Sequence, residues 1–246
     1  MRRMRPLGLS LVAAFALSAV AATAAQALPE GPFYKVEGNR LLATETKELK
    51  AKAASSFTLE AASIGVAVTC TSLKLKPGAT IVGSTGENAG TSEEVIEFSG
   101  CTVTGNGEGC KVENEAVTTS TVEDALGYSS SSRSGPLLVS FHPKTGKVFV
   151  ELKFVGAKCI LPSTKVEGTV VGEAFASGKQ VEVTKNEVEL TSSEIKFGKA
   201  SKTVFVESGG VLTSTKAKLT SFGIGATLEG TSQQELAGGS KWGIFT

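Results

Sequence analysis

The sequence predicts an all-β fold: an antiparallel β-sandwich, with a closed β-barrel as the alternative, stapled by disulfides. Three observations favour this class. Apolar residues alternate with polar ones in short runs, glycine-containing turns separate the runs, and the cysteine count is even. Roughly a dozen such runs are present, which is typical of a sandwich or a barrel. With 41% hydrophobic and 20% charged residues, the 246-residue chain can bury a substantial core.

The first 27 residues have the three-part order of a secretory signal peptide. Three arginines among the first five residues precede an apolar, alanine-rich run over residues 7–22 and a small-x-small step at residues 25–27. The apolar run is shorter than the ~20 residues that a membrane-spanning helix needs. We expect cleavage after Ala27, with Ala24 as the alternative, which leaves residues 28–246 as a single β-rich domain.

Removal of this segment affects which partners are expected. The three arginines leave with it, so the formal net charge of +1 becomes negative, and Arg40 and Arg133 are the remaining arginines. Nucleic-acid-binding surfaces are rich in Lys and Arg and strongly positive, so no nucleic-acid partner is expected. No later run is long and apolar enough to be a transmembrane segment. We expect a secreted protein, extracellular or in the cell envelope, where a cell-surface or glycan partner would be found.

The four cysteines are Cys70, Cys101, Cys110 and Cys159, and an even number in an exported chain predicts two disulfides. Residues 104–107 (Thr-Gly-Asn-Gly) can turn the chain so that Cys101 and Cys110 face each other across a hairpin. We therefore expect the bonds Cys101–Cys110 and Cys70–Cys159, although the sequence alone allows three connectivities.

The first half of the mature chain contains one expected helix and two expected loops. Residues 45–54 favour helix by composition, but their apolar face is thin, so that helix would be peripheral. Residues 77–94 are rich in glycine and poor in apolar residues, and residues 127–135 are polar and serine-rich. Both segments are expected to be solvated loops.

Two runs in the middle of the chain are expected to form a hairpin. Residues 137–142 and 147–154 flank Pro143-Lys144-Thr145-Gly146, a sequence typical of a tight turn. In the second run, one set of residues is expected to face the core: Val148, Val150, Leu152 and Phe154. The other set is expected to face solvent: Phe149, Glu151 and Lys153.

Later runs follow the same logic. Alternating residues at 181–183 and 188–190 predict two more strands. Ser208-Gly209-Gly210 predicts a hairpin turn between residues 203–207 and 211–218, because such turns need positive φ, which glycine adopts readily.

One internal similarity stands out. Val166-Glu167-Gly168-Thr169 recurs as Leu228-Glu229-Gly230-Thr231, and a Glu and a Lys further along match at the same offset. Two readings remain open: equivalent strand–turn–strand units from an old duplication, or coincidence in a sequence dominated by Gly, Thr, Glu and Val. A single recurrence does not indicate a repeat array.

The side chains that catalysis commonly uses are scarce. The chain has one His (His142) and one Asp (Asp124), and no serine lies in a G-x-S-x-G turn that would mark a nucleophile. His142 is out of phase with the apolar residues of its run and is expected to face solvent. The cysteines lack C-x-x-C spacing, one Asp cannot build a calcium loop, and the glycine-rich residues 105–109 have no lysine for phosphate. We expect no catalytic residue, no metal and no cofactor.

Glutamates are plentiful, and three pairs invite a comparison with glycoside hydrolases, which need two carboxylates. These pairs are Glu93/Glu94, Glu113/Glu115 and Glu187/Glu189. The last two pairs have i, i+2 spacing, which places each pair on one face of a strand, and we expect that face to be solvated. One Trp and two Tyr offer few of the aromatic platforms that sugar sites use.

The C-terminal residues 242–246 (Trp-Gly-Ile-Phe-Thr) resemble the closing strand of an outer-membrane barrel. Such barrels carry girdles of Trp and Tyr at both membrane interfaces. Here 12 aromatic residues are Phe, against one Trp and two Tyr. With two expected disulfides, this composition favours a fold outside the membrane.

The strand and cysteine patterns of the chain are its most recognisable features: Glu97-Phe98-Ser99-Gly100-Cys101-Thr102-Val103, Gly109-Cys110-Lys111-Val112, residues 135–154, and Leu228-Glu229-Gly230 with residues 241–246. In these patterns, which cover most of the mature chain, the protein resembles uncharacterised secreted bacterial β-rich proteins. That group has no assigned activity, so the resemblance implies neither a function nor site residues.

The leading interpretation is a secreted, non-enzymatic binding or structural module. The alternatives are a secreted polysaccharide hydrolase that uses a Glu pair, and a small-ligand carrier with a barrel interior. A cleft with two facing Glu carboxylates ~5–10 Å apart would favour the hydrolase. A closed barrel with an apolar cavity would favour the carrier.

Overall fold

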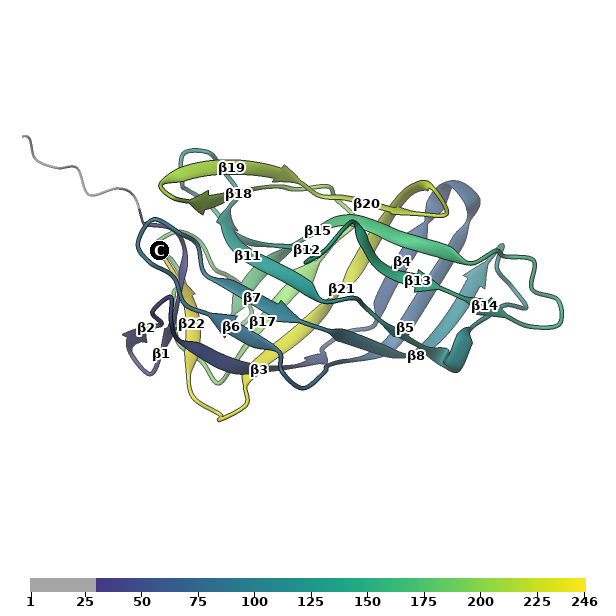
Figure 1. Ribbon diagram of the computed structural model, residues 1–246, viewed down its shortest axis with the longest axis horizontal. Coiled ribbons are helices and arrows are strands. Elements are labelled where there is room, and N and C mark those ends of the chain that lie inside the picture. Colours follow the sequence, from purple (N-terminus) through teal and green to yellow (C-terminus); the bar gives the residue numbers. More distant parts are fainter. Residues whose placement is uncertain (1–29) are drawn as a thin grey trace, which may run out of the picture.

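The computed structural model describes residues 30–246, and this part of the chain is built almost entirely of antiparallel strands (Figure 1). The expected signal peptide, residues 1–27, lies outside the described residues. Two short 3₁₀ helices occur, η1 (Ala62–Ile64) and η2 (Glu113–Glu115). In chain order the strands are β1 (Phe33–Val36), β2 (Asn39–Arg40), β3 (Thr46–Ala53), β4 (Phe57–Ala61), β5 (Val66–Leu75), β6 (Thr80–Val82), β7 (Thr91–Glu94), β8 (Ile96–Gly105), β9 (Lys111–Val112), β10 (Ala116–Thr118), β11 (Val122–Tyr128), β12 (Leu137–Pro143), β13 (Val148–Leu152), β14 (Phe154–Val155), β15 (Thr164–Ala176), β16 (Lys179–Gln180), β17 (Ser192–Phe197), β18 (Thr203–Ser208), β19 (Val211–Lys216), β20 (Lys218–Ser221), β21 (Ile224–Leu236) and β22 (Trp242–Phe245).

Strand pairing closes a barrel. Toward one end, the ring runs β3–β6–β7–β11–β12–β15–β17–β21 and returns to β3. Toward the other end, β15 pairs with β13 and β20, while β21 pairs with β20 and β4, and β5, β8 and β10 continue from β4. The all-β prediction is confirmed. The architecture is the closed barrel and not the sandwich, because β6 and β7 join β3 to β11 and leave no free edge between them.

The two longest strands, β15 and β21, have 13 residues each and change partners at a glycine. Gly168 in β15 has φ 121° and Gly230 in β21 has φ 155°. A Cβ at Gly168 would lie 1.9 Å from the backbone oxygen of Lys218, and one at Gly230 would lie 2.6 Å from the ring of Phe57. Glycine is therefore required at both bends. These glycines are matching positions of the internal sequence similarity, which marks the place where each long strand changes partners.

A three-stranded sheet, β2–β1–β22, lies at the end of the barrel where the chain terminates (Figure 1). Tyr34 from β1 and Trp242 from β22 are 3% and 1% exposed, and their ring centroids are 6.0 Å apart. Both belong to the same buried cluster as the barrel residues. This sheet therefore extends the barrel core.

The hairpin expected around Ser208-Gly209-Gly210 is confirmed. Strands β18 and β19 pair from Thr203–Lys216 to Ser208–Val211, and Gly209 and Gly210 both have positive φ. The local turn chemistry was sufficient to predict this element.

The hairpin expected around residues 143–146 is wrong, although the strands on either side exist. Strands β12 and β13 follow one another along β15, with Phe141 opposite Val170 and Val148 opposite Glu167. Because β12 and β13 are both antiparallel to β15, they run in the same direction. The residues between them form a connecting loop and do not reverse the chain. A register shift after Val148 also turns Phe149 inward to 7% exposure, where solvent exposure was expected.

The helix expected over residues 45–54 is wrong, because this segment forms β3. Helix propensity is a weak prior that tertiary pairing overrides. Here β21 pairs along one side of the strand and β6 along the other, and Leu49 enters the core at 3% exposure.

Two further expectations need correction. The loop expected over residues 77–94 contains β6, which has only three residues, and β7, which is polar in sequence. The loop expected over residues 127–135 is confirmed from Ser129 onward. Residues 181–183 and 188–190, expected to be strands, contribute isolated bridges to Pro136 and Trp242. Segments that pair over so few residues are too short to be recognised from the alternation of apolar and polar residues.

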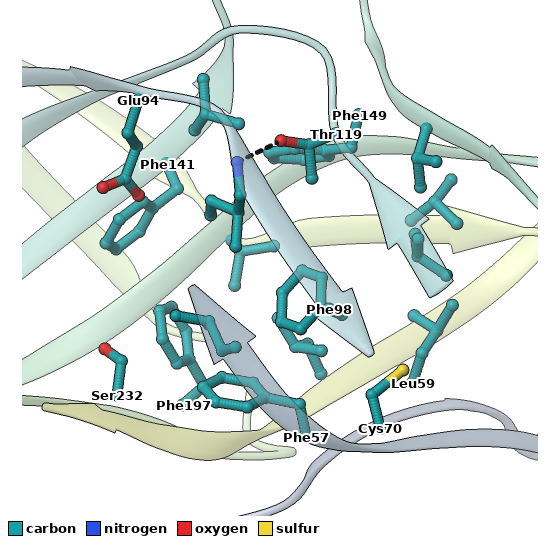
Figure 2. Close-up of a pocket in the computed structure, with 18 of the residues that line it drawn as sticks. Phe57, Leu59, Cys70, Glu94, Phe98, Thr119, Phe141, Phe149, Phe197 and Ser232 are labelled. Atoms are coloured by element: carbon teal, nitrogen blue, oxygen red, sulfur yellow. Dashed lines mark hydrogen bonds between the residues drawn. The ribbon is translucent and has the colours of Figure 1, made fainter. Parts of the chain in front are cut away.

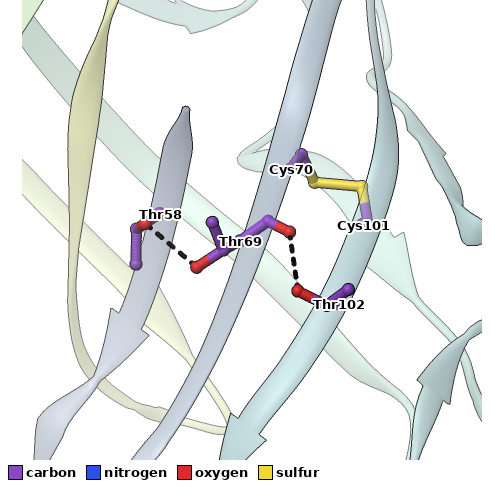
Figure 3. The surroundings of a disulfide bond; sticks show 5 residues. All are labelled: Thr58, Thr69, Cys70, Cys101 and Thr102. Atoms are coloured by element: carbon purple, nitrogen blue, oxygen red, sulfur yellow. Dashed lines mark hydrogen bonds between the residues drawn. A yellow bond between two sulfur atoms is a disulfide. The ribbon is translucent and has the colours of Figure 1, made fainter. Parts of the chain in front are cut away.

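All four cysteines form disulfides, but the expected pairing is wrong: the bonds are Cys70–Cys101 and Cys110–Cys159. Cys70 in β5 and Cys101 in β8 are directly opposite each other, with Cα atoms 3.9 Å apart (Figure 3). Strand β8 stays paired with β5 as far as Gly105, so Cys101 faces β5 and not the chain that follows it. Cys110, beyond the turn, bonds Cys159 with a Cα separation of 4.5 Å.

Candidate ligand-binding cavity

The barrel encloses an apolar cavity of about 110 Å³ (Figure 2). Its wall consists mainly of phenylalanine and aliphatic side chains, because alternate residues of each barrel strand point inward. Its polar members are few: Glu94, Thr119, Ser232 and Gln234. An apolar cavity of ~150 Å³ can hold benzene, so the cavity volume is comparable with that of a small organic molecule.

One part of the cavity wall, which we call the phenylalanine end, is formed by Phe57, Phe98 and Phe197. The ring of Phe57 lies 5.4 Å from that of Phe98 and 6.0 Å from that of Phe197, in edge-to-face and tilted arrangements. Aromatic pairs prefer such geometry. Phe141 continues the cluster, with its ring 5.2 Å from Phe197. These rings provide a dry surface for an apolar ligand.

Another part of the wall, which we call the carboxyl end, is formed by Glu94, with Asp124 of the neighbouring strand behind it. Ser92 and Glu94 are alternate, buried residues of β7, and Asp124 is a buried residue of β11. In the β7–β11 register, Glu94 is opposite Val122 and Asp124 is opposite Ser92. The two carboxyl groups therefore occupy neighbouring positions on the inner face of the barrel. Glu94 and Asp124 are each 3% exposed.

The carboxyl end is incompletely hydrogen-bonded. The Ser92 hydroxyl donates to Oδ2 of Asp124, whereas Oδ1 of Asp124 and Oε2 of Glu94 are buried with no hydrogen-bond partner in the described part of the chain. Burial raises the pKa of Glu94 to about 8, and the charge of Asp124 adds to this rise. Burial also raises the pKa of Asp124 to about 6, against the lowering effect of its bonds with Ser92. At neutral pH, Glu94 therefore retains its proton while Asp124 is mostly ionised.

Tyr34, from the three-stranded sheet, covers the carboxyl end. Its burial raises its pKa well above the ordinary value, and the charges of Asp124 and Glu94 act in the same direction. Gly90 makes room for the tyrosine, because a Cβ there would lie 2.9 Å from the ring. Tyr34 therefore remains a neutral phenol beside the two carboxyl groups.

The structure does not bring His142 and Asp124 together. They are on adjacent strands, but Asp124 is opposite Phe141 and faces the interior, while His142 is opposite Glu123. The His142 side chain is 44% exposed, with Nε2 3.9 Å from a Glu123 carboxylate oxygen. The solvent-facing expectation for His142 is met, and Asp124 has a different environment from the one a catalytic triad requires.

The three glutamate pairs have three different environments. Glu94 is buried in the cavity wall, while its neighbour Glu93 forms an ion pair with Lys144 on the outer surface. The second pair, Glu113 and Glu115, is exposed as expected, but it lies in the 3₁₀ helix η2 and not in a strand.

The third pair connects distant segments. Glu187 accepts hydrogen bonds from the backbone and hydroxyl of Thr246, at 2.8 and 2.6 Å, and Glu189 accepts from the backbone of Gly38. Both residues are partly buried and are not the fully solvated strand residues that were expected. These hydrogen bonds give both glutamates a structural role, which is to hold segments that are far apart in the sequence together.

Among the residues that the structure describes, no Lys, Arg or His lines the cavity. Across residues 30–246, no group of three His, Cys, Asp or Glu side chains is arranged to hold a metal ion. The four cysteines are committed to disulfides. Glu94 is thus the titratable residue in the cavity wall, with Asp124 and Tyr34 behind it.

Sequence reasoning missed the carboxyl end. A signal was present for Asp124, which stands in the same phase as Val122, Leu126 and Tyr128, all buried in β11. Glu94 gave no comparable signal, because β7 reads Thr-Ser-Glu-Glu and resembles a polar loop. Its burial depends on the pairing of β7 with β6 and β11.

Comparison with family models, with curated proteins and with solved structures finds no significant match. Within residues 30–246, no helix has the length and apolar character needed to cross a membrane. The cavity therefore has to be interpreted from its own residues.

Proposed function

We propose that this protein binds a small, largely apolar molecule inside its β-barrel. The observation that supports this is the closed ring of strands around a cavity of about 110 Å³ with a mainly hydrophobic wall. Barrels of about eight strands can hold one small ligand in this position. A concave apolar site with a few polar groups is also typical of small-molecule sites.

The other interpretations account for less of the structure. A polysaccharide hydrolase needs two carboxylates across a site that admits a sugar chain, whereas only Glu94 lines this small apolar cavity and Asp124 is buried behind it. A purely structural module does not need such a cavity. The absence of catalysis stays a prediction, which assays of the protein on glycans, esters and peptides would test.

We also propose that the protein acts outside the cytoplasm. The two disulfides support this, because such bonds persist in oxidising compartments. The order of basic, apolar and small residues over positions 1–27 supports it further. N-terminal sequencing of the exported product should find Leu28 first, and an intact Met1 would contradict export by this route.

Ligand-dependent stabilisation tests the binding proposal. Thermal unfolding can be followed by the fluorescence of Trp242, the single tryptophan of the chain, which is 1% exposed in the folded state. A molecule that binds the folded state raises the melting temperature with its concentration. We expect 1-hexanol and benzene, each at about 1 mM and above, to raise the melting temperature of the wild-type protein.

Two valine variants provide the matched comparison. Val68→Phe should remove the stabilisation because Val68 lines the cavity, whereas Val211→Phe should keep it because Val211 is 64% exposed on β19. If Val68→Phe does not fold, Ala51→Leu fills the same cavity from β3. No stabilisation of the wild type by either probe, or equal stabilisation of the cavity-filled variants, would overturn the proposal.

A further inference from the structure

Glu94 is a buried residue of the cavity wall whose carboxyl group is not fully hydrogen-bonded by the rest of the protein. Its side chain lines the cavity at 3% exposure, and Oε2 has no hydrogen-bond partner. Figure 2 shows its carboxyl group beside the ring of Phe141, which also lines the cavity. Buried polar atoms in proteins are nearly always hydrogen-bonded, so this oxygen needs an explanation.

A second buried glutamate shows how the same protein satisfies such a group when it is structural. Glu207 is 1% exposed and accepts two hydrogen bonds from the guanidinium of Arg133, at 2.7 and 2.9 Å. Glu94 has no such cation within residues 30–246, because none of the Lys, Arg or His side chains described there lines the cavity. The nearby Lys144 is paired with the exposed Glu93 instead. The position of a counter-cation at Glu94 is therefore open to a ligand.

We propose that the cavity binds a small lipophilic amine, with the ammonium group at Glu94 and the hydrocarbon part against the phenylalanine end. This inference rests on the proposed function, since it names the ligand class of the same cavity. An ammonium group donates charge-assisted hydrogen bonds to a carboxylate, and the ring of Phe141 beside Glu94 can face a cation favourably. The apolar wall accommodates the rest of the molecule.

The proton balance of binding follows from the groups around Glu94. Asp124 from β11 and Tyr34 from β1 are the titratable groups that interact with it, while β12 and β21 present Phe141, Ser232 and Gln234. The free site holds a proton on Glu94. An alkyl ammonium, with a pKa near that of lysine (~10.4), enters charged. The carboxylic acid O–H bond then breaks, its proton passes to the buffer, and the carboxylate accepts N–H bonds.

Other ligand classes fit less well. An alcohol of the same length would exchange a hydrogen bond with the neutral acid but would gain no charge attraction. A carboxylate would add a further acid beside Glu94 and Asp124, and buried like charges repel. The predicted order of affinity is therefore amine, then alcohol, then carboxylate.

The test compares hexylamine, 1-hexanol and hexanoate, which share one tail length, by isothermal titration calorimetry. Near pH 7 we expect hexylamine to bind at least ~10-fold more tightly than 1-hexanol, because hydrogen bonds to charged groups are the stronger ones. Titrations in two buffers of different ionisation enthalpy should show release of up to about one proton per hexylamine. The affinity for hexylamine should rise from about pH 6 to about pH 9, as Glu94 no longer has to lose a proton.

Glu94→Gln should weaken hexylamine binding at least ~10-fold and abolish proton release, while 1-hexanol binding changes by less than about threefold. Glu93→Gln, which alters the adjacent exposed residue, should leave hexylamine binding unchanged. Asp124→Asn is the second variant if Glu94→Gln is misfolded, and it should reduce the preference for the amine.

The outcomes separate the two proposals. Equal affinities for hexylamine and 1-hexanol, or hexylamine binding that Glu94→Gln leaves intact, would overturn the amine inference and leave the apolar-ligand proposal in place. Tighter binding of hexanoate would also overturn the amine inference. If none of the three probes binds the folded wild type, and the stabilisation test with benzene is negative as well, the proposed function fails.

Discussion

The two ends of the barrel cavity are built on different strands, β4, β8 and β17 at the phenylalanine end and β7 and β11 at the carboxyl end, and they differ in how completely the fold hydrogen-bonds or packs their side chains. At the phenylalanine end, Phe57 contacts Phe98 and Phe197 at favourable ring distances and needs no other partner. At the carboxyl end, Glu94 and Asp124 are equally buried, and each has an oxygen without a hydrogen bond. The first arrangement stabilises the fold, whereas the second costs stability.

This difference indicates where to look for function. Sequences generally agree with their folds at every level, and exceptions are expected mainly at functional sites. The carboxyl end is such an exception, because Gln or Leu at position 94 would be easier to bury. This contrast is the reason for assigning the ligand's polar group to the carboxyl end. Four measurements test this difference between the two ends.

The largest expected effect comes from removing an aromatic ring at the phenylalanine end. Phe57→Ala deletes a side chain that is 2% exposed and contacts two other rings. We expect a loss of about 3–5 kcal/mol in the free energy of unfolding, the range for Phe→Ala in a core. Urea unfolding followed by Trp242 fluorescence measures it, with Ile160→Ala (87% exposed) as the control. A loss below about 1 kcal/mol would show that this end is not the packed core.

At the carboxyl end, replacing the side chain should stabilise the protein relative to the wild type as the pH rises, whereas the Phe57 replacement destabilises it. The folded-state pKa of Glu94 is raised to about 8 from an ordinary 4.5, so the folded state holds the proton more tightly. The unfolding free energy of the wild type should therefore fall between about pH 4.5 and pH 8, whereas Glu94→Gln should escape this part of the fall.

Each pKa unit corresponds to ~1.4 kcal/mol, so Glu94→Gln should gain about 2–4 kcal/mol relative to the wild type between pH 5 and pH 9. Urea unfolding at both pH values measures this difference. Glu93→Gln, at the exposed neighbouring position, should show no comparable gain. A pH-independent difference between Glu94→Gln and the wild type would mean that Glu94 ionises normally in the folded state.

A smaller effect defines how far the packed aromatic region extends. The sequence places Phe154 in the core, but in the structure it is partly exposed in β14 and stacks on Phe222 at 5.8 Å. We expect Phe154→Ala to cost about 1–2 kcal/mol, less than full burial of a Phe would imply. Thermal melts of Phe154→Ala and Phe57→Ala side by side would test this, and equal losses would contradict it.

The smallest effect is expected outside the barrel wall. His142→Ala removes a side chain that is 44% exposed, and such surface changes usually stay within about 0.5 kcal/mol. The same variant should bind hexylamine and 1-hexanol like the wild type. Loss of binding would show that the outer face near Pro143 contributes to the site.

Part of this protein was predictable from local sequence. The apolar run of β12, the alternation within β11 and the two-glycine turn between β18 and β19 depend on residues that are close together in the chain. The candidate site was largely beyond such reasoning. Asp124 occupies the same alternating positions as the buried apolar residues of β11, which is visible in the sequence. Glu94 lies in a four-residue strand with no apolar residue, so its burial is not.

The all-β class, the turn between β18 and β19 and the presence of two disulfides were predictable from the sequence alone, because period-two alternation, turn residues and cysteine number are local or compositional properties. The choice of which strands pair was made only in the tertiary structure. That choice closed the barrel through β6 and β7, joined Cys70 to Cys101 and placed Glu94 beside Asp124. The physical reason is that register and closure arise from contacts between segments far apart in the chain, and a residue's burial follows from its neighbours across the sheet.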